Sequence, residues 1–158
     1  MRRKDKEIHE EDLIGQIMTK ARVCRLGLCK DNMPYIVPVA FGYDGAFIFF
    51  HSADEGMKLD YLACNNRICF ELEHEVRVIP NATEACKWSF SYYSVIGFGT
   101  VAEIVDQQRK VYALNEIMRH YSNREWTYDG HAMEKVRLWC ISIEQVTGKQ
   151  SQDKIADG

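Results

Sequence analysis

Phe47-Ile48-Phe49-Phe50-His51-Ser52-Ala53-Asp54-Glu55-Gly56-Met57-Lys58-Leu59-Asp60-Tyr61-Leu62 is the stretch that decides the fold. Its first four residues are apolar and three of them are aromatic, which predicts a strand buried on both faces. The chain becomes polar at His51 and Ser52, and residues 54–56 break the extended pattern. The apolar residues Leu59 and Leu62 then predict a short helix that begins near Met57.

A strand that opens into a helix through small and polar residues is a candidate anion site. The backbone N–H groups of the first helical turn point outward, and the helix dipole favours negative charge there. Ser52 can donate a hydroxyl, and Lys58 adds a positive charge. The stretch is therefore interpreted either as a phosphate-binding site or as an ordinary strand–loop–helix connection. His51 is likewise either a functional residue or a polar plug at the strand end.

Length and composition predict a single soluble domain over residues 1–158, with flexible tails at residues 1–8 and 149–158. Hydrophobic residues make up 46% of the chain and charged residues 27%, as in ordinary globular proteins. A net charge of −3 gives no electrostatic signal for nucleic acid or for anionic lipid. No apolar run follows the charged residues 1–6, so we expect neither a signal peptide nor a membrane span, and a cytoplasmic location.

The chain contains six cysteines, and their pattern predicts no metal site. No two cysteines are spaced as Cys-x-x-Cys, and no histidine lies at a metal-finger spacing. We expect most of the cysteines to be buried thiols in a reducing compartment.

The rest of the chain reads as strands joined by tight turns, with helices at the ends. Alternation of apolar and polar residues predicts strands over residues 22–29, 34–42, 67–78, 88–104 and 136–146. Helical spacing predicts helices over residues 12–21 and 107–121, with Asp106 as the N-cap of the second. The fold class expected is mainly β with flanking helices, arranged as a small β-barrel.

Pro38 is the unusual feature of the strand over residues 34–42. Proline cannot donate to a strand ladder, so this part of the strand is expected at a sheet edge. The backbone groups of Val37, Val39 and Phe41 are then either free for a ligand or part of an ordinary protected edge.

No catalytic triad is visible, and the catalytic residues stay unassigned. His74, His120 and His131 are expected at the surface, and Glu71 and Glu73, on alternate positions of one strand face, have no evident partner acid. The aromatic residues Trp88, Tyr92 and Tyr93 either stack on a planar ligand or belong to the core.

Five pieces in one order resemble the pyridoxamine 5′-phosphate oxidase-like flavoproteins, and most closely the nitroimidazole-resistance-related branch. The pieces are residues 24–28, residues 34–43, Phe49-Phe50-His51-Ser52-Ala53 with Gly56 and Lys58, residues 66–71, and Trp88 with residues 92–99. The resemblance covers residues 12–150. It implies an FMN-binding split β-barrel that works as a homodimer, with FMN at the subunit interface.

The same resemblance implies the site residues. Val37, Pro38, Val39, Ala40 and Phe41 would lie along the flavin, partly through their backbone. His51, Ser52, Ala53 and Lys58 would hold the ribityl phosphate and the ring edge. Tyr93, Ser94 and Val95 would come from the partner chain.

The expected function is that of an FMN-dependent oxidoreductase that passes electrons from a reduced nicotinamide to a small aromatic or nitro compound. One alternative is a binding module of the same fold that holds flavin or haem without turnover. Another is a true pyridoxamine 5′-phosphate oxidase. The chain departs from those oxidases because residues 148–153 contain no arginine and residues 56–58 supply one cation.

Overall fold

Strands form most of the molecule. The computed structural model describes residues 3–122, 124, 126–129, 133 and 136–151. In chain order the elements are η1 (Lys4–Lys6), β1 (Glu7–Ile8), α1 (Glu11–Lys20), β2 (Cys24–Lys30), β3 (Met33–Val39), β4 (Phe41–Tyr43), β5 (Phe47–Ser52), α2 (Met57–Cys64), β6 (Arg67–Ile79), η2 (Ala85–Lys87), β7 (Ser89–Ile104), α3 (Gln107–Tyr121) and β8 (Arg137–Ser151).

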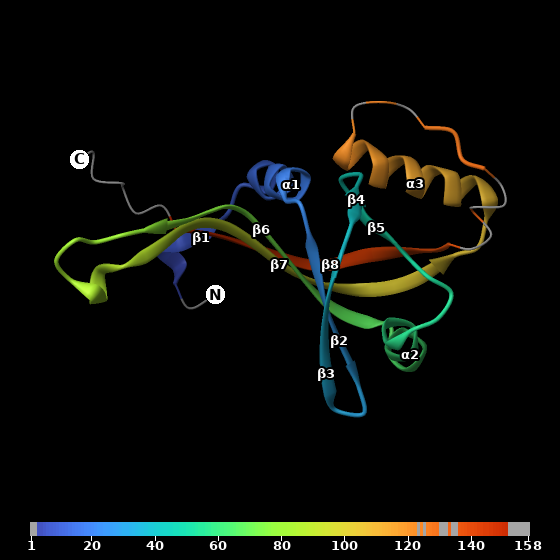
Figure 1. The fold of residues 1–158 in the computed structure, drawn as a ribbon, viewed down its shortest axis with the longest axis horizontal. Coiled ribbons are helices and arrows are strands. Elements are labelled where there is room, and N and C mark those ends of the chain that lie inside the picture. The colour runs from blue at the N-terminus through green and yellow to red at the C-terminus, as the bar shows by residue number, and fades with distance from the viewer. Residues whose placement is uncertain (1–2, 123, 125, 130–132, 134–135, 152–158) are drawn as a thin grey trace.

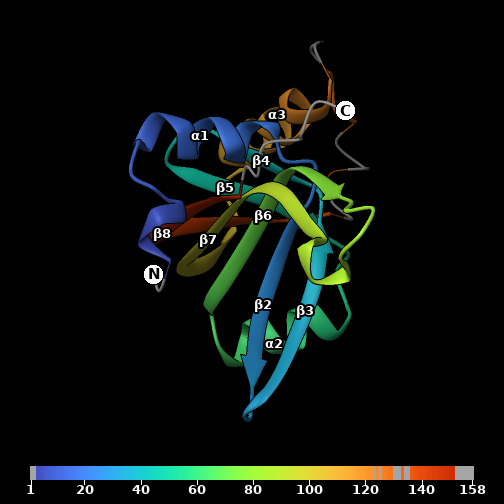
Figure 2. The same cartoon turned by 90° about the vertical axis from the view of Figure 1, so that its left-hand side faces the viewer.

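The strands build one curled antiparallel sheet in the order β3-β2-β6-β7-β8-β5-β4. Its two end strands, β3 and β4, are consecutive in the chain and are separated only by Ala40. The sheet must therefore curl until its ends meet at this residue, and Figures 1 and 2 show the resulting half-barrel with β2 and β3 crossing the long β6–β7–β8 layer. The predicted strand over residues 34–42 is thus divided at Ala40, because its first half pairs with β2 and its second half with β5.

Local sequence signals account for most elements. Ile48, Phe49 and Phe50 are buried as predicted, with Phe50 fully enclosed. Asp31 and Asn32 take φ values of 50° and 61° in the β2–β3 turn, which is the backbone conformation of a tight hairpin. The side chain of Asp106 accepts a hydrogen bond of 2.9 Å from Arg109 N and caps α3 as predicted.

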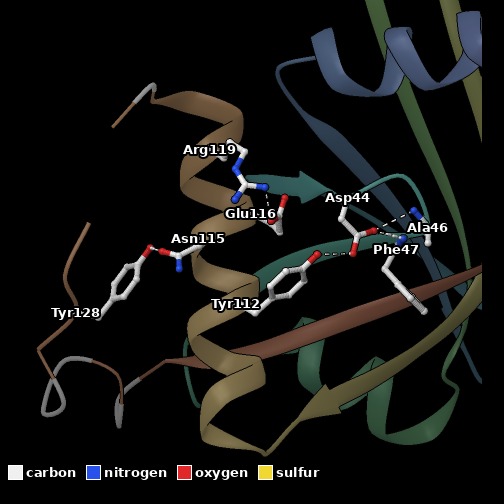
Figure 3. A network of polar contacts seen from close by, with 8 residues as sticks. All are labelled: Asp44, Ala46, Phe47, Tyr112, Asn115, Glu116, Arg119 and Tyr128. Carbon is white, nitrogen blue, oxygen red and sulfur yellow. Dashed lines mark hydrogen bonds and ion pairs between the residues drawn. The ribbon is translucent and has the colours of Figure 1, made fainter. Parts of the chain in front are cut away.

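The helices cover the openings of the curled sheet. α1 buries Ile14, Ile17 and Met18 against the core. α3 lies against β4 and β5, and Figure 3 shows how it holds their connecting turn. There Asp44 accepts hydrogen bonds from the backbone N–H groups of Ala46 (2.9 Å) and Phe47 (2.8 Å) and from the Tyr112 hydroxyl at 3.0 Å. The strand that ends at Ser52 therefore starts from a fixed turn.

Four expectations need correction. Only Cys24 and Cys140 of the six cysteines are buried, not most of them as expected. Residues expected in the two tails are paired, because β1 pairs with β8 at Glu7↔Lys149 and Ile8↔Gly148, and Ile8 is only 3% exposed. β8 also continues to Ser151, while residues 152–158 lie outside the described residues. His120 is not a surface residue: its ring lies 4.2 Å from that of Phe41, and its Nε2 lies 2.6 Å from the Ala21 carbonyl.

His131, expected at the surface, lies outside the described residues. Among the helices of the described part, none is both long enough and apolar enough to span a bilayer.

Replacement of Gly42 by alanine should destabilise the fold. A Cβ atom at Gly42 would lie 2.4 Å from the backbone carbon of Glu116 and 2.5 Å from Ile117 N, so α3 would have to move away from β4. We expect Gly42→Ala to lower the free energy of unfolding by about 3 kcal/mol, as overpacking does, in urea titrations followed by circular dichroism.

Gly15→Ala is the matched control. Gly15 lies within α1 and nothing lies within 4 Å of its added Cβ, so alanine there should raise stability by about 0.5–1 kcal/mol. Equal midpoints for Gly42→Ala and the unchanged protein would contradict the close packing of β4 on α3.

Candidate functional site

The β4–β5 ladder brings together two of the three predicted groups of site residues: residues 37–41, and residues 51–53 with Lys58. Phe41 pairs with Phe50, so the bend at Ala40 lies level with His51. Lys58 follows in the first turn of α2. β3 is an edge strand, which confirms the position predicted from Pro38.

Some residues of the β3–β4 stretch expose their side chains, whereas others have their side chains buried in the core. Pro38 and Ala40 are exposed and Val37 is half-buried, whereas the side chains of Val39 and Phe41 are buried in the core. The last two can meet a ligand only through their backbone, and the N–H of Phe41 already donates to the Tyr121 hydroxyl at 3.1 Å.

The hydroxyl of Ser52 is buried and already makes two hydrogen bonds. It is 7% exposed, it accepts a hydrogen bond of 3.0 Å from Trp139 Nε1, and it donates to the Ala53 carbonyl at 2.8 Å. The hydroxyl must leave the Ala53 carbonyl before it can donate to an anion. Its present role is to fix the end of β5 against β8.

Lys58 supplies a positive charge that no described residue pairs with a carboxylate. Its Nζ lies 3.4 Å from the His51 carbonyl and 5.4 Å from the centre of the Phe50 ring, and burial lowers its pKa. Gly56, at φ 126°, precedes α2, and no side chain caps the helix. The first-turn N–H groups and Lys58 thus present donors and charge together, as an anion requires.

His51 adds no charge to this cluster near neutral pH. Burial lowers the pKa of its imidazole, and the positive charge of Lys58 lowers it further. A neutral imidazole both donates and accepts hydrogen bonds, so His51 can contact a ring edge or a phosphate without adding to the positive potential.

Arg137 and Trp139 were not predicted as site residues. Arg137 pairs with Ser52 in the β5–β8 ladder, its guanidinium lies 4.9 Å from the Trp139 ring, and it makes two hydrogen bonds to Glu103 of 2.8 and 2.5 Å. The Glu103 carboxylate raises the pKa of Arg137. The guanidinium of Arg137, the second cation at this corner, is therefore already paired with Glu103. The sequence signal for this residue was that Arg137 and Trp139 lie on the same face of a predicted strand.

The third group, Tyr93, Ser94 and Val95, lies elsewhere in the same chain. His51 is level with Leu138 of β8, whereas Val95 is level with Gly148, ten residues further along and roughly 33 Å away in an extended strand. The Val95 side chain is fully buried, and Ser94 Oγ donates to Glu71 at 3.4 Å. Within one chain this group is therefore separated from His51, although Val95 is level with Val39 across β6 and β2.

The outward face of the sheet carries an unusual amount of exposed apolar surface. Seven of the fourteen large apolar side chains exposed in the described residues are Ile36 of β3, Val76 and Val78 of β6, Trp88 just before β7, and Phe90, Ile96 and Phe98 of β7. Exposed apolar side chains gathered on one face of a sheet are typical of an interaction surface.

Arg25 lies within this outward face and forms ion pairs with both Glu71 and Glu73. Its guanidinium pairs with Glu71 at 3.2 Å and with Glu73 at 3.0 Å. Burial, and then the charge of Glu73, raise the pKa of Glu71. The two carboxylates therefore share one cation.

A groove of about 1030 Å³ between α1, the β4–β5 turn and α3 contains none of the predicted site residues. Among the described residues no group of three or more histidine, cysteine or acidic side chains is arranged to hold a metal ion.

Comparisons with known proteins agree with this geometry. Residues 10–150 match the pyridoxamine 5′-phosphate oxidase family. A candidate 5-nitroimidazole antibiotic resistance protein from Bacteroides thetaiotaomicron is 31% identical, over 90% of this chain and 85% of that chain, with a TM-score of 0.80. The curled sheet is thus the split barrel of these relatives, and the resemblance drawn from the sequence is confirmed.

More distant structures share the fold alone. A FAD and haem binding protein from Mycobacterium smegmatis is 19% identical over 97% of this chain and 77% of that chain, with a TM-score of 0.83. A FAD-binding protein from Mesorhizobium loti is 23% identical over 87% and 92%, with a TM-score of 0.64. A search of curated proteins found no match to this chain.

Removal of the Lys58 charge should raise the pKa of His51. In Lys58→Met the electrostatic part of the shift disappears while the part due to burial stays, so the imidazole titrates closer to its ordinary value of about 6.5. NMR titration of the His51 ring, assigned by its loss in His51→Gln, measures this change.

The lowered pKa of His51 also determines how the free energy of unfolding depends on pH. Because the folded chain resists protonation of His51, this residue lowers the free energy of unfolding as pH falls below its unfolded pKa. Lys20→Met, in α1, is the control and should leave the His51 titration unchanged. An unaltered His51 pKa in Lys58→Met would refute the electrostatic contact.

Proposed function

Because the chain belongs to the pyridoxamine 5′-phosphate oxidase family, we propose that it is an FMN-dependent oxidoreductase. It takes electrons from a reduced nicotinamide and passes them to a small aromatic or nitro compound. The observation that carries the proposal is the charge of Lys58, which no carboxylate among the described residues pairs, at the uncapped start of α2 and next to the exposed bend at Ala40. The similarity to a candidate 5-nitroimidazole resistance protein supports a nitro compound as acceptor.

The residues present fit a flavin phosphate. The first-turn N–H groups of α2 and Lys58 would bind the phosphate, and Ser52 and Ala53 would border it at the end of β5. Among the described residues only one cation at this corner is free of a carboxylate, since Arg137 pairs with Glu103. One free cation supports the single phosphate of FMN over the diphosphate of FAD.

The bend between β3 and β4 would orient the ring system. Pro38 and Ala40 offer exposed surface, and Val37, Val39 and Phe41 offer backbone atoms along the same edge. When bound, a flavin supplies reversible two-electron chemistry. The protein's part is to hold the ring against this edge, with neutral His51 beside it, and to exclude water from one side.

We further propose that the working form is a homodimer with the flavin at the seam. Tyr93 and Ser94 lie far from His51 within one chain, so they complete the site only as residues of a second copy. The apolar outward face around Ile96 and Phe98 supplies the contact surface. Six free thiols support a cytoplasmic location.

Two alternatives of the same fold make different predictions. A binding module would hold flavin, or haem, without turnover, and the Mycobacterium smegmatis FAD and haem binding protein gives this alternative its support. A pyridoxamine 5′-phosphate oxidase would need a second phosphate site, for which β8 offers Lys149 and no arginine between residues 148 and 151.

The first test is spectroscopic. Purified protein incubated with FMN and freed of excess ligand should keep the flavin absorption. Without oxygen, a reduced nicotinamide should bleach this absorption, and a nitroaromatic compound should restore it. Protein that stays colourless overturns flavin binding, whereas bound flavin that no nicotinamide reduces favours the binding module. Formation of pyridoxal phosphate from its amine would favour the oxidase.

Lys58→Ala tests the phosphate site in the same assay. Loss of a charge-assisted contact should weaken FMN binding by about 10- to 100-fold, yet leave the affinity for riboflavin unchanged because riboflavin has no phosphate. Lys20→Ala should alter neither affinity. An equal loss of FMN and riboflavin binding would show that Lys58 acts on the fold and not on the phosphate.

Phe98→Glu tests the dimer. Phe98 is 48% exposed within the outward apolar face, and a charge buried there without a partner opposes association. Sedimentation velocity should show a monomer. Val105→Glu is the control, since Val105 is 79% exposed just beyond the end of β7. A Phe98→Glu protein that remains a dimer of unchanged strength would refute this interface.

A further inference from the structure

The hairpin made by the end of β6 and the start of β7, residues 75–92, extends beyond the barrel, as Figure 1 shows, and is called the arm here. β8 accompanies β7 only as far as Tyr92↔Ser151. Beyond that point the pairs Val78↔Phe90 and Ile79↔Ser89 have no third strand beside them among the described residues. A two-stranded ribbon of this kind is only marginally stable by itself in water.

One face of the arm is apolar and exposed. Val76, Val78, Trp88 and Phe90 are 48%, 54%, 56% and 54% exposed. Val78 lies directly opposite Phe90, and the two-residue period of a strand puts Trp88 on the same side. The same period continues along β7 to Ile96 and Phe98, so the arm prolongs the outward face of the barrel.

The tip of the arm holds Trp88 in a fixed orientation. Asn81 Oδ1 accepts hydrogen bonds from Thr83 N at 3.1 Å and Glu84 N at 2.8 Å, and the Asn81 carbonyl accepts one of 2.8 Å from Trp88 Nε1. The indole N–H is thus satisfied within the tip while more than half of the residue stays exposed. An ordered, exposed tryptophan loses little entropy on association and is the residue type most enriched among binding hot spots.

The arm and α2 lie at opposite ends of the same strand. β6 begins at Arg67, just after α2 ends at Cys64, and runs into the arm at its other end (Figure 1). In the proposed homodimer, Tyr93 and Ser94 lie at the flavin site of the second copy, beside its α2. The arm ends at Tyr92, the residue before Tyr93, so the base of the arm lies at that end of the second copy.

We propose that the arm of each subunit lies across its partner, and that Trp88 lines the partner's flavin site. The occupant of the arm's apolar face is a second copy of this chain. The receiving end is apolar too: Met33 and Ile36 of β3 and Met57 of α2 are 62%, 69% and 57% exposed. The assignment of Trp88 to a flavin site rests on the proposed flavin function, and the contact between arm and partner rests on the proposed homodimer.

Native cysteines allow the contact to be tested without added flavin. Cys86 lies in the arm, Cys64 ends α2, and all of Cys29, Cys64 and Cys86 are exposed thiols. Asn65 Nδ2 donates to the Cys29 carbonyl at 3.3 Å, so Cys29 and Cys64 lie at the same end of the barrel. A short bismaleimide should give a covalent dimer in which mass spectrometry finds Cys86 joined to Cys64 or Cys29, and Cys86→Ser should abolish it. Products that join only Cys86 to Cys86, or no covalent dimer, overturn the proposal.

Trp88→Ala tests the role of the ring, with Trp126→Ala as the matched control. Trp126 is also exposed, and its indole donates to Ser122 at 3.3 Å outside the arm. Trp88→Ala should raise the dimer dissociation constant roughly tenfold or more and increase the fluorescence of bound FMN, because an adjacent indole quenches flavin emission; Trp126→Ala should do neither. Unchanged dimer strength and emission in Trp88→Ala overturn the proposal. Protein that forms the Cys86–Cys64 or Cys86–Cys29 dimer but binds no FMN refutes the proposed function alone.

Discussion

Ala40 joins the two ends of the sheet, and the position of the site follows from this single link. β3 and β4 occupy opposite ends of the strand order, yet one residue separates them, so the sheet closes on itself. Tyr121 holds the link: its hydroxyl accepts from Phe41 N at 3.1 Å and donates to the Arg22 carbonyl at 2.9 Å. The missing side chain at Gly42 lets the backbone of α3 approach this point. The end of β5, and with it His51, is therefore held beside a backbone bend that faces outward.

Elements with local signals were predicted from the sequence, and features set by pairing were not. β5 and α3 follow from their own apolar spacing and from the cap at Asp106. The division of the strand at Ala40 depends on which strands flank each half, and the residues themselves do not encode that. The pairing of β1 with β8 joins residues about 140 positions apart in the sequence, and short polar segments give no periodic signal from which to infer it.

At the site, too, features with local sequence signals were predicted, and features set by distant contacts were not. Lys58 and the start of α2 were predicted because strand, breaker and helix follow one another in the chain. The bonds from Trp139 to Ser52 and from Arg137 to Glu103 were not, since they bridge 87 and 34 residues. These distant bonds change the chemistry expected of the corner, because they occupy the Ser52 hydroxyl and pair the Arg137 charge. What a ligand meets here is decided by these cross-strand contacts as much as by the motif.

Within the described residues, this corner has one cation free of a carboxylate and one neutral imidazole, which make a weak anion site by themselves. Charge-assisted contacts contribute about 1.5–3 kcal/mol each, which is far below the roughly 8 kcal/mol of a micromolar ligand. On the proposed function the remainder comes from the ring, which one chain leaves open on the side away from Ala40. Ligand binding and subunit association are then thermodynamically linked, because a ligand that binds only the dimer stabilises it in proportion to its saturation. On the proposed homodimer, the exposed apolar face and the incomplete site have one explanation: each subunit would provide half of the enclosure that the other lacks.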